Sequence, residues 1–242
     1  DFFVQVNHWA AAISPSVWSC LTTLGETDVL LVLLSGLLLW RPQAMLSVVA
    51  AIPVGGLFSW LLKNIYSAPR PGALLDAAQF HLIGPLLEQN SFPSGHSITA
   101  FAAAAAVIAS GQRAQADGRP SLSVNQFVAL LALCVATALA VGVSRIAVGA
   151  HWPVDVLAGA SGGWLAGLSG AWWARRHESV WASRRNQLWM GAFLFGLGLW
   201  LMARPSDYPL GVWALRLAVL GAALTLFVQF RAWRAGRSGS AA

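Results

Sequence analysis

Long hydrophobic stretches separated by short polar segments dominate the pattern of this chain. A helix needs roughly 20 apolar residues to cross the hydrocarbon core of a bilayer. The two shortest stretches can reach that length by extending into their flanks. The pattern therefore predicts an all-α polytopic transmembrane helix bundle with six or seven spans. The seven stretches cover residues 28–40, 44–62, 97–110, 126–143, 153–174, 187–203 and 211–230.

The two ends of the chain carry a different pattern. Residues 1–24 mix aromatic and aliphatic side chains with polar ones, including His8, and predict a helix that lies at the membrane surface. Residues 231–242 are rich in Arg, Gly and Ser and predict a flexible basic tail. No internal repeat or second domain is visible, so we expect a single integral membrane domain over residues 1–242.

Composition strengthens the membrane interpretation. Hydrophobic residues make up 57% of the chain and charged residues only 10%, whereas a soluble domain carries about a quarter charged residues. A net charge of +6 would also suit a nucleic-acid binder, but the basic residues fall mostly at the ends of apolar stretches. We therefore expect membrane lipids and no nucleic acid as partners. Cys20 and Cys134 show no metal-ligand spacing and are interpreted as small hydrophobic residues.

The basic residues also predict how the chain crosses the membrane. If the spans alternate in direction, one side of the membrane holds the end of the second span, the start of the third, the end of the fourth and the start of the fifth. That side holds four basic residues, Lys63, Arg70, Arg145 and Arg204, against ten on the other. Because cytoplasmic loops carry the excess of Lys and Arg, the first side faces away from the cytoplasm. The ten are Arg41, Arg113, Arg119, Arg175, Arg176, Arg184, Arg185, Arg231, Arg234 and Arg237.

Three polar segments at the ends of these spans carry the candidate chemistry. Together they provide three permanent cations, a helix start with free N–H groups, two histidines and one carboxylate. Three cations around one helix start would repel each other unless an anion joins them, and a phosphate monoester or a terminal diphosphate fits. The segments contribute Lys63, Arg70 and Pro71; Pro93, Ser94, Gly95 and His96; and Ser144, Arg145, His151 and Asp155.

The two histidines suit different roles in phosphoryl transfer. His151 is followed four residues later by Asp155, at a helix start announced by Pro153. A carboxylate that holds the Nδ1 proton leaves Nε2 free to attack phosphorus. His96 lies at the predicted phosphate-binding turn and suits protonation of the leaving oxygen.

Each residue also has a simpler interpretation. The single cations could be side chains that reach the membrane surface, Asp155 a helix-start acid and Ser94 a helix cap. Only their joint occurrence at the matching ends of alternating spans favours chemistry. No carboxylate cluster suggests Mg²⁺ or Zn²⁺, so we expect a metal-free mechanism without a cofactor. His81 stays open between loop structure and chemistry.

At these residues the sequence resembles the type 2 phosphatidic acid phosphatase superfamily. The matching motifs are Lys-x6-Arg-Pro, Pro-Ser-Gly-His and Ser-Arg-x5-His-x3-Asp, in order from Lys63 to Asp155. The resemblance implies a helical core, a phosphohistidine intermediate on His151 and acid catalysis by His96. It also implies phosphate binding by Lys63, Arg70, Ser94, Gly95 and Arg145. Pro71, Pro93 and Ser144 belong to the motifs without an assigned role.

The resemblance implies a membrane lipid phosphatase in a bacterial inner membrane, with its site facing the periplasm. Undecaprenyl diphosphate is the first candidate substrate, and phosphatidylglycerophosphate and lipid A 1-phosphate are the alternatives. A lipid phosphotransferase would differ only in the acceptor. Seven apolar stretches do not suit a soluble vanadium haloperoxidase, and a lipid-phosphate binder or transporter would not need His151 paired with Asp155. The oligomeric state stays open.

Overall fold

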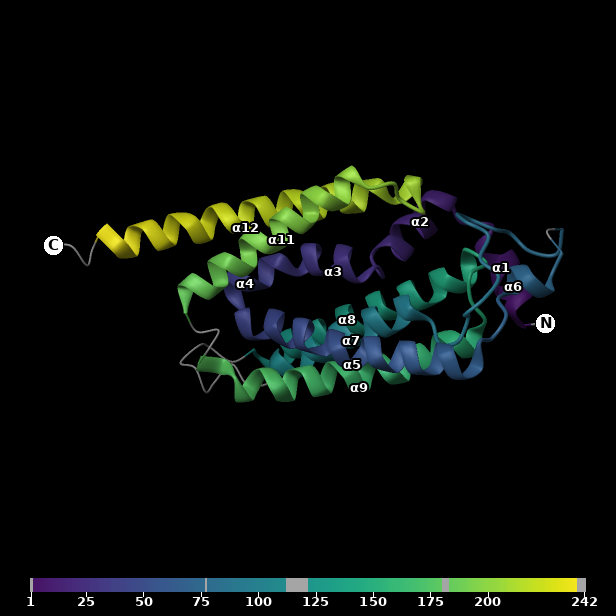
Figure 1. Cartoon of the computed structure of the whole chain (residues 1–242), viewed down its shortest axis with the longest axis horizontal. Helices are drawn as coiled ribbons and strands as arrows, with labels where there is room; N and C mark the ends of the chain where they lie inside the picture. The colour runs from purple at the N-terminus through teal and green to yellow at the C-terminus, as the bar shows by residue number, and fades with distance from the viewer. Residues whose placement is uncertain (1, 77, 112–121, 180–182, 239–242) are drawn as a thin grey trace.

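The computed structural model of the chain describes residues 2–76, 78–111, 122–179 and 183–238. These residues form an elongated helical bundle, and they contain no strand. Figure 1 shows the longer helices running along the long axis of the molecule. They are α5 (Pro42–Tyr66), α7 (Gly95–Gly111), α8 (Val124–Ala147), α9 (Pro153–Arg176), α11 (Arg184–Ala203) and α12 (Val212–Ser238). The shorter elements are α1 (Phe2–Ala10), α2 (Pro15–Thr23), α3 (Thr27–Leu33), η1 (Leu34–Gly36), α4 (Leu37–Trp40), α6 (Pro71–Leu74) and η2 (Pro209–Gly211).

Fewer elements meet the length and hydropathy of a membrane span than the sequence predicted. Within the described ranges, four helical segments qualify, and they contain α5, α8, α11 and α12. A fifth span is possible if α2 and the α3–α4 segment, which meet at 83°, form one broken span. The expected count of six or seven is therefore not confirmed. α7 has only 17 residues, and the glycines of α9 lower its hydropathy.

The two ends of the chain also differ from expectation. The predicted single surface helix over residues 1–24 is two helices, α1 and α2, joined by residues 11–14. Both have buried side chains, and the Trp18 indole donates a hydrogen bond to the Ala10 carbonyl at 2.8 Å. Most of the predicted basic tail continues α12 as far as Ser238. Residues 239–242 and the segment that holds Arg113 and Arg119 lie outside the described residues.

Small residues bring α7 and α9 into close contact. A Cβ atom added to Gly159 would lie 2.6 Å from the Ser94 carbonyl oxygen, and one added to Gly163 would collide with the Ile98 carbonyl. Gly167 repeats this contact one turn later, against Ala102. Such four-residue spacing of small residues lets helix backbones approach closely in lipid. It places the start of α7 directly beside the start of α9.

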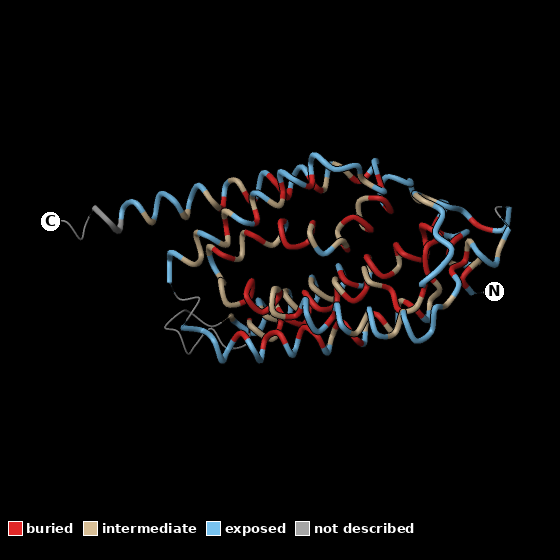
Figure 2. Tube along the Cα trace, in the orientation of Figure 1, coloured by how far each residue is buried: buried red, intermediate tan, exposed pale blue. Residues whose placement is uncertain are grey.

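α5 and α8 pack directly on α7 and α9, and α3, α11 and α12 form a second layer over these four helices. α11 and α12 pack against each other and against α3 through a hydrophobic cluster that includes Val32, Leu201 and Leu215. Figure 2 shows buried residues concentrated on the inward faces of the helices, while the outward faces and the far end of α12 are exposed. Exposed Leu, Phe and Trp side chains on these outward faces suit contact with lipid.

Candidate active site

The three motif segments meet at one end of the bundle, where α5 and α8 end and α7 and α9 begin (Figure 1). α5 ends at Ser67, whose backbone is left-handed with φ of 41°. α8 ends in a turn through Gly149, with φ of 79°, which is a conformation that favours glycine. These two turns carry the chain from the helix ends into the segments that hold Arg70 and His151.

Hydrogen bonds determine the tautomer of His151. Its Nδ1 lies 3.3 Å from Oδ2 of Asp155, and its Nε2 lies 3.2 Å from Nη1 of Arg70. An arginine only donates and a carboxylate only accepts. Nδ1 therefore carries the proton, and Nε2 keeps its lone pair. Both His151 and Asp155 are buried, with 2% and 1% of their surface exposed.

Asp155 is held by more than His151. Its Oδ2 accepts hydrogen bonds from the Ser91 hydroxyl and, at 2.8 Å, from the Trp152 backbone N–H. Its carbonyl accepts from the Ser94 N–H at 3.0 Å, which ties the start of α9 to the start of α7. The sequence analysis missed Ser91. Its position two residues before Pro93 was the only available signal.

Arg70 is fixed by backbone carbonyls on both sides of the site. Nε donates to Gln89 at 2.8 Å, Nη2 to Asn90 at 3.3 Å, and Nη1 to Ala150 at 3.0 Å. The side chain is buried. The guanidinium is thus held beside Nε2 of His151 before any ligand arrives.

Arg145 is buried and anchored by residues that the sequence analysis did not identify. Its Nη1 donates to the Thr22 hydroxyl and, at 3.0 Å, to the Tyr208 hydroxyl. Its Nε has no hydrogen-bond partner among the described residues. Thr22 lies in α2 and Tyr208 just before η2, far from the motifs in sequence, so no spacing could have revealed them.

Lys63 and His96 complete the group. The Lys63 ammonium lies within electrostatic range of Arg70, Arg145 and Asp155. His96 is similarly close to Arg145 and His151, and its Nε2 is buried without a hydrogen-bond partner in the described part of the chain. The structure therefore brings all the predicted charged and imidazole side chains to one place.

The charges around His151 change its protonation. Burial, followed by the positive charges of Arg145, Arg70 and Lys63, holds the pKa of His151 well below its usual value. His151 is therefore neutral at neutral pH, which agrees with the tautomer inferred from its hydrogen bonds.

The other motif residues have structural roles. The Ser94 hydroxyl accepts a hydrogen bond from the Ser97 hydroxyl at 3.0 Å and caps the start of α7. A Cβ on Gly95 would meet no atom within 4 Å, so open space adjoins this helix start. Ser144 donates to the Val141 carbonyl within its own helix. Pro71 begins α6, and Pro93 is buried just before α7.

His81 and His8 take part in a neighbouring contact with α1. Their rings lie 5.4 Å apart, edge to face. The buried Asn7 accepts a hydrogen bond from the His81 N–H at 2.7 Å and donates to the Ile146 carbonyl at 3.1 Å. α1 thus joins the 75–94 loop to the end of α8. None of these bonds reaches the motif side chains, which favours a structural role for His81.

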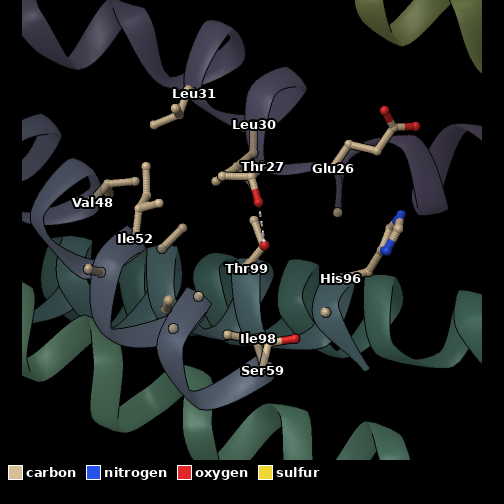
Figure 3. Close-up of a pocket in the computed structure, with 17 residues that line it drawn as sticks. Glu26, Thr27, Leu30, Leu31, Val48, Ile52, Ser59, His96, Ile98 and Thr99 are labelled. Atoms are coloured by element: carbon tan, nitrogen blue, oxygen red, sulfur yellow. Dashed lines mark hydrogen bonds between the residues drawn. The ribbon is translucent and has the colours of Figure 1, made fainter. Parts of the chain in front are cut away.

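Two adjoining cavities open from His96. An apolar cavity of about 300 Å³ lies between α3, α5 and α7 and is lined by residues such as Leu31 and Ile52. Figure 3 shows His96 at one end of it, with Glu26 across from it. The second cavity shares His96 and Glu26 but is more polar, and it continues towards the loop before η2. Its remaining lining residues are Thr27, Asp28, Leu31, Ile52, Arg204, Asp207 and Tyr208.

The described residues include no group of three or more His, Cys, Asp or Glu side chains placed to hold a metal ion. The arrangement instead offers an imidazole with a free lone pair, a second imidazole, and three cations.

Comparison with known proteins agrees with these motifs. Residues 44–179, more than half of the chain, match the model of the PAP2 superfamily. A lipid A 1-phosphatase from Rhizobium etli is 35% identical over 114 residues, which cover 45% of this chain and 41% of that protein. The chain therefore matches about two fifths of the length of this curated relative.

A solved structure is also similar. The crystal structure of Aquifex aeolicus LpxE matches with a TM-score of 0.57 and 27% identity, covering 70% of this chain and 92% of that one. The region that matches the superfamily model, residues 44–179, contains all three motifs and the converging helix ends described above. The chain belongs to the PAP2 superfamily, that of the type 2 phosphatidic acid phosphatases.

Proposed function

We propose that this protein is a membrane lipid phosphatase that removes the 1-phosphate of lipid A, or of a closely related acylated sugar phosphate, through a phosphohistidine on His151. The observation that carries the mechanism is the hydrogen bonding of His151, which leaves Nε2 unprotonated beside Arg70. The substrate class is supported by the lipid A 1-phosphatase among the similar proteins. Undecaprenyl diphosphate, the first candidate from the sequence, stays a prediction.

In the first step, the Nε2 lone pair of His151 attacks phosphorus, and the bond from phosphorus to the lipid oxygen breaks. Arg70, Arg145 and Lys63 stabilise the charge on the phosphoryl oxygens. Burial and the neighbouring cations lower the pKa of His96, so the negative charge of the bound phosphate is needed for His96 to hold a proton. The departing oxygen takes that proton, and the lipid leaves as an alcohol. Asp155 stabilises the positive charge that develops on the imidazole of His151.

In the second step, water attacks the phosphohistidine. His96, now neutral, accepts a proton from this water as the N–P bond breaks. The products are inorganic phosphate, free His151 and a protonated His96, which restores the starting state. The cations and the start of α7 supply the anion binding throughout, so we expect the reaction to persist in excess EDTA.

The position of the site suits a lipid substrate. The motifs lie where apolar helices begin and end, so a headgroup can reach His151 while its acyl chains stay in the bilayer. From the distribution of Arg residues we infer that this end faces the periplasm of a bacterial inner membrane.

Phosphate release from a panel of purified lipids tests this function. We expect lipid A 1-phosphate to be hydrolysed faster than phosphatidylglycerophosphate and undecaprenyl diphosphate, with and without EDTA. His151→Ala should reduce release by at least about a thousandfold while the protein remains folded in detergent. Full activity of this variant would disprove the nucleophile, and loss in EDTA that Mg²⁺ restores would disprove the metal-free mechanism. Faster release from undecaprenyl diphosphate would overturn the substrate assignment alone.

A further inference from the structure

The polar cavity beside His96 has an acidic wall, defined here as Glu26, Asp28 and Asp207. Arg204 lies among these carboxylates, with Nη2 at 2.8 Å from Glu26 and Nη1 at 3.3 Å from Asp28. The three carboxylates and one guanidinium leave a formal charge of −2 on this wall. The side chains of Glu26 and Asp28 are only 16% and 26% exposed, so solvent screens their charges incompletely.

The cations that act on His96 carry the opposite charge. Arg70, Arg145 and Lys63 all act electrostatically on His96, and the structure places them around His151. His96 lines both cavities and has a buried Nε2 without a partner in the described chain. His96 thus lies close to the cations and also lines the cavity that holds the acidic wall, where the charge has the opposite sign.

This difference in sign matters for the group that departs. When His151 attacks a monoester, the P–O bond breaks, the lipid oxygen takes the proton from His96, and the leaving group is an uncharged alcohol. When it attacks the terminal phosphorus of a diphosphate, the leaving group is a lipid monophosphate. That monophosphate carries its negative charge on the side of His96 where the acidic wall lies.

We propose that the acidic wall makes this enzyme select lipid monophosphates over lipid diphosphates, and that its leaving-group cavity takes an uncharged, hydroxyl-bearing headgroup. Like charges repel most strongly where water is partly excluded, so a second phosphate is disfavoured there. Carboxylates accept hydrogen bonds from sugar or glycerol hydroxyls, and the adjoining apolar cavity can take part of an acyl chain. This inference rests on the proposed function and narrows its substrate.

The wall comes from segments outside the region that matches the family. Glu26 and Asp28 precede residue 44, and Arg204 and Asp207 follow residue 179. We therefore assign the preference for lipid monophosphates to the segments before residue 44 and after residue 179 rather than to the three motifs.

Matched lipid pairs test the inference. The kcat/KM for lipid A 1-phosphate is compared with that for lipid A 1-diphosphate, and phosphatidic acid is compared with diacylglycerol diphosphate. We expect the monophosphate of each pair to be favoured by about tenfold or more, with a ratio that falls as salt screens the wall. Asp207→Asn, which leaves the ion pairs of Arg204 in place, should reduce the ratio several-fold. The combined Glu26→Gln, Asp28→Asn and Asp207→Asn variant should reduce it further, mainly by raising activity on the diphosphates.

Asp76→Asn is the matched control, because Asp76 is an exposed carboxylate at the same end of the molecule and lines neither cavity. Its ratio should equal that of the wild type. Equal or faster hydrolysis of the diphosphates by the wild type, or an unchanged ratio in Asp207→Asn, would overturn the inference and leave the phosphatase intact. No phosphate release from any of the four lipids would overturn the proposed function as well.

Discussion

His151 shows how neighbouring groups prepare one residue for one role. Asp155 orients its Nδ1 proton, and Arg70 points a guanidinium at its Nε2. A cation next to an imidazole opposes protonation, while a carboxylate supports the charge that appears only when Nε2 forms a bond. The resting enzyme therefore keeps a neutral nucleophile, and the phosphate dianion balances the cations when it binds.

The pKa of His151 leads to a measurable pH dependence. Burial and the charges of Arg145 and Arg70 hold this pKa well below its usual value, so His151 stays unprotonated as the pH falls through about 6.5. In NMR spectra of the protein with ¹³C-labelled histidine, the His151 resonance is identified by its absence from the spectrum of His151→Gln. We expect this resonance to keep the chemical shift of a neutral imidazole as the pH falls through about 6.5. A histidine in a short peptide titrates in the same range. A midpoint for His151 at or above that of the peptide would contradict the prediction.

The same shift affects stability. In the unfolded chain His151 has an ordinary pKa and binds a proton first as the pH falls. The unfolded state then binds more protons than the folded state, so the free energy of unfolding decreases below about pH 6.5. We expect His151→Gln, which cannot titrate, to lose less stability than the wild type between pH 7 and pH 5 in thermal denaturation.

At the level of elements, the outer helices hold a residue of the inner site. α2 supplies Thr22 and the segment before η2 supplies Tyr208, and both accept hydrogen bonds from Arg145 at the end of α8. Among the described residues, the Arg145 guanidinium donates to Thr22 and Tyr208 rather than to a motif side chain, yet its charge acts on His151. The amino-terminal helices and the α11–α12 hairpin thus position a phosphate-binding cation.

Tyr208→Phe tests this positioning. Removing the hydroxyl leaves the buried Arg145 guanidinium with one acceptor fewer, and hydrogen bonds to charged groups contribute about 1.5–3 kcal/mol. We expect kcat/KM to fall by roughly tenfold to a hundredfold. KM should rise even at a temperature where both proteins are fully folded, so that lost stability does not account for the change. Tyr66→Phe, a change at the chain's other tyrosine, is the control and should have little effect. Unchanged KM in Tyr208→Phe would show that Arg145 does not depend on this contact.

The contact between α7 and α9 sets the distance between the two histidines. Gly159 and Gly163 leave no room for a side chain against the α7 backbone. In the sequence, the four-residue spacing of these glycines was visible only as a glycine-rich span. Its consequence is that the Ser94–Asp155 backbone bond can form and hold the two helix starts together.

Gly163→Ala tests this contact. The added methyl group collides with the Ile98 carbonyl, and overpacking of this kind costs about 1–3 kcal/mol. We expect the melting temperature in detergent to fall by several degrees. In Gly221→Ala the new methyl group meets no atom within 4 Å, so this control should be neutral or slightly stabilising because alanine favours helix. Equal melting temperatures for the two variants would contradict close packing at Gly163.

At the level of the whole molecule, the charged residues divide between the two ends of the bundle. The motif end, at the right of Figure 1, holds Lys63, Arg70 and Arg145. The opposite end holds the start of α5, the end of α9, the start of α11 and the end of α12, which together carry most of the remaining described Arg residues. The positive-inside rule then predicts that the motif end faces the periplasm.

Cysteine labelling in intact bacterial cells tests this orientation. In a background with Cys20 and Cys134 replaced by Ser, Asp76→Cys at the motif end should react with a membrane-impermeant maleimide. Arg175→Cys, at the other end, should react only after the cells are opened. The reverse pattern would place the site in the cytoplasm and remove the periplasmic assignment.

The sequence by itself determined the helical fold class and the family of this protein, and it predicted the chemistry. Apolar stretches predicted the helices, and the order of Lys63, Arg70, His96, Arg145, His151 and Asp155 predicted both the family and the phosphate site. These features are local, because the length of an apolar stretch and the spacing of a motif can be read along the chain. The number of membrane spans did not follow in the same way, since α7 is short and α2 and α3 meet at a sharp bend.

Only the tertiary structure decided which further residues serve the site. Ser91 contacts Asp155, Thr22 and Tyr208 contact Arg145, and Glu26 lines the cavity beside His96. These contacts join segments that lie up to 123 residues apart in the chain. They depend on how closely the helices pack and where the outer layer rests, and neither leaves a periodic signal in the sequence. The motifs predict that a phosphate is bound, and the surrounding packing determines how its cations are held and what the leaving group meets.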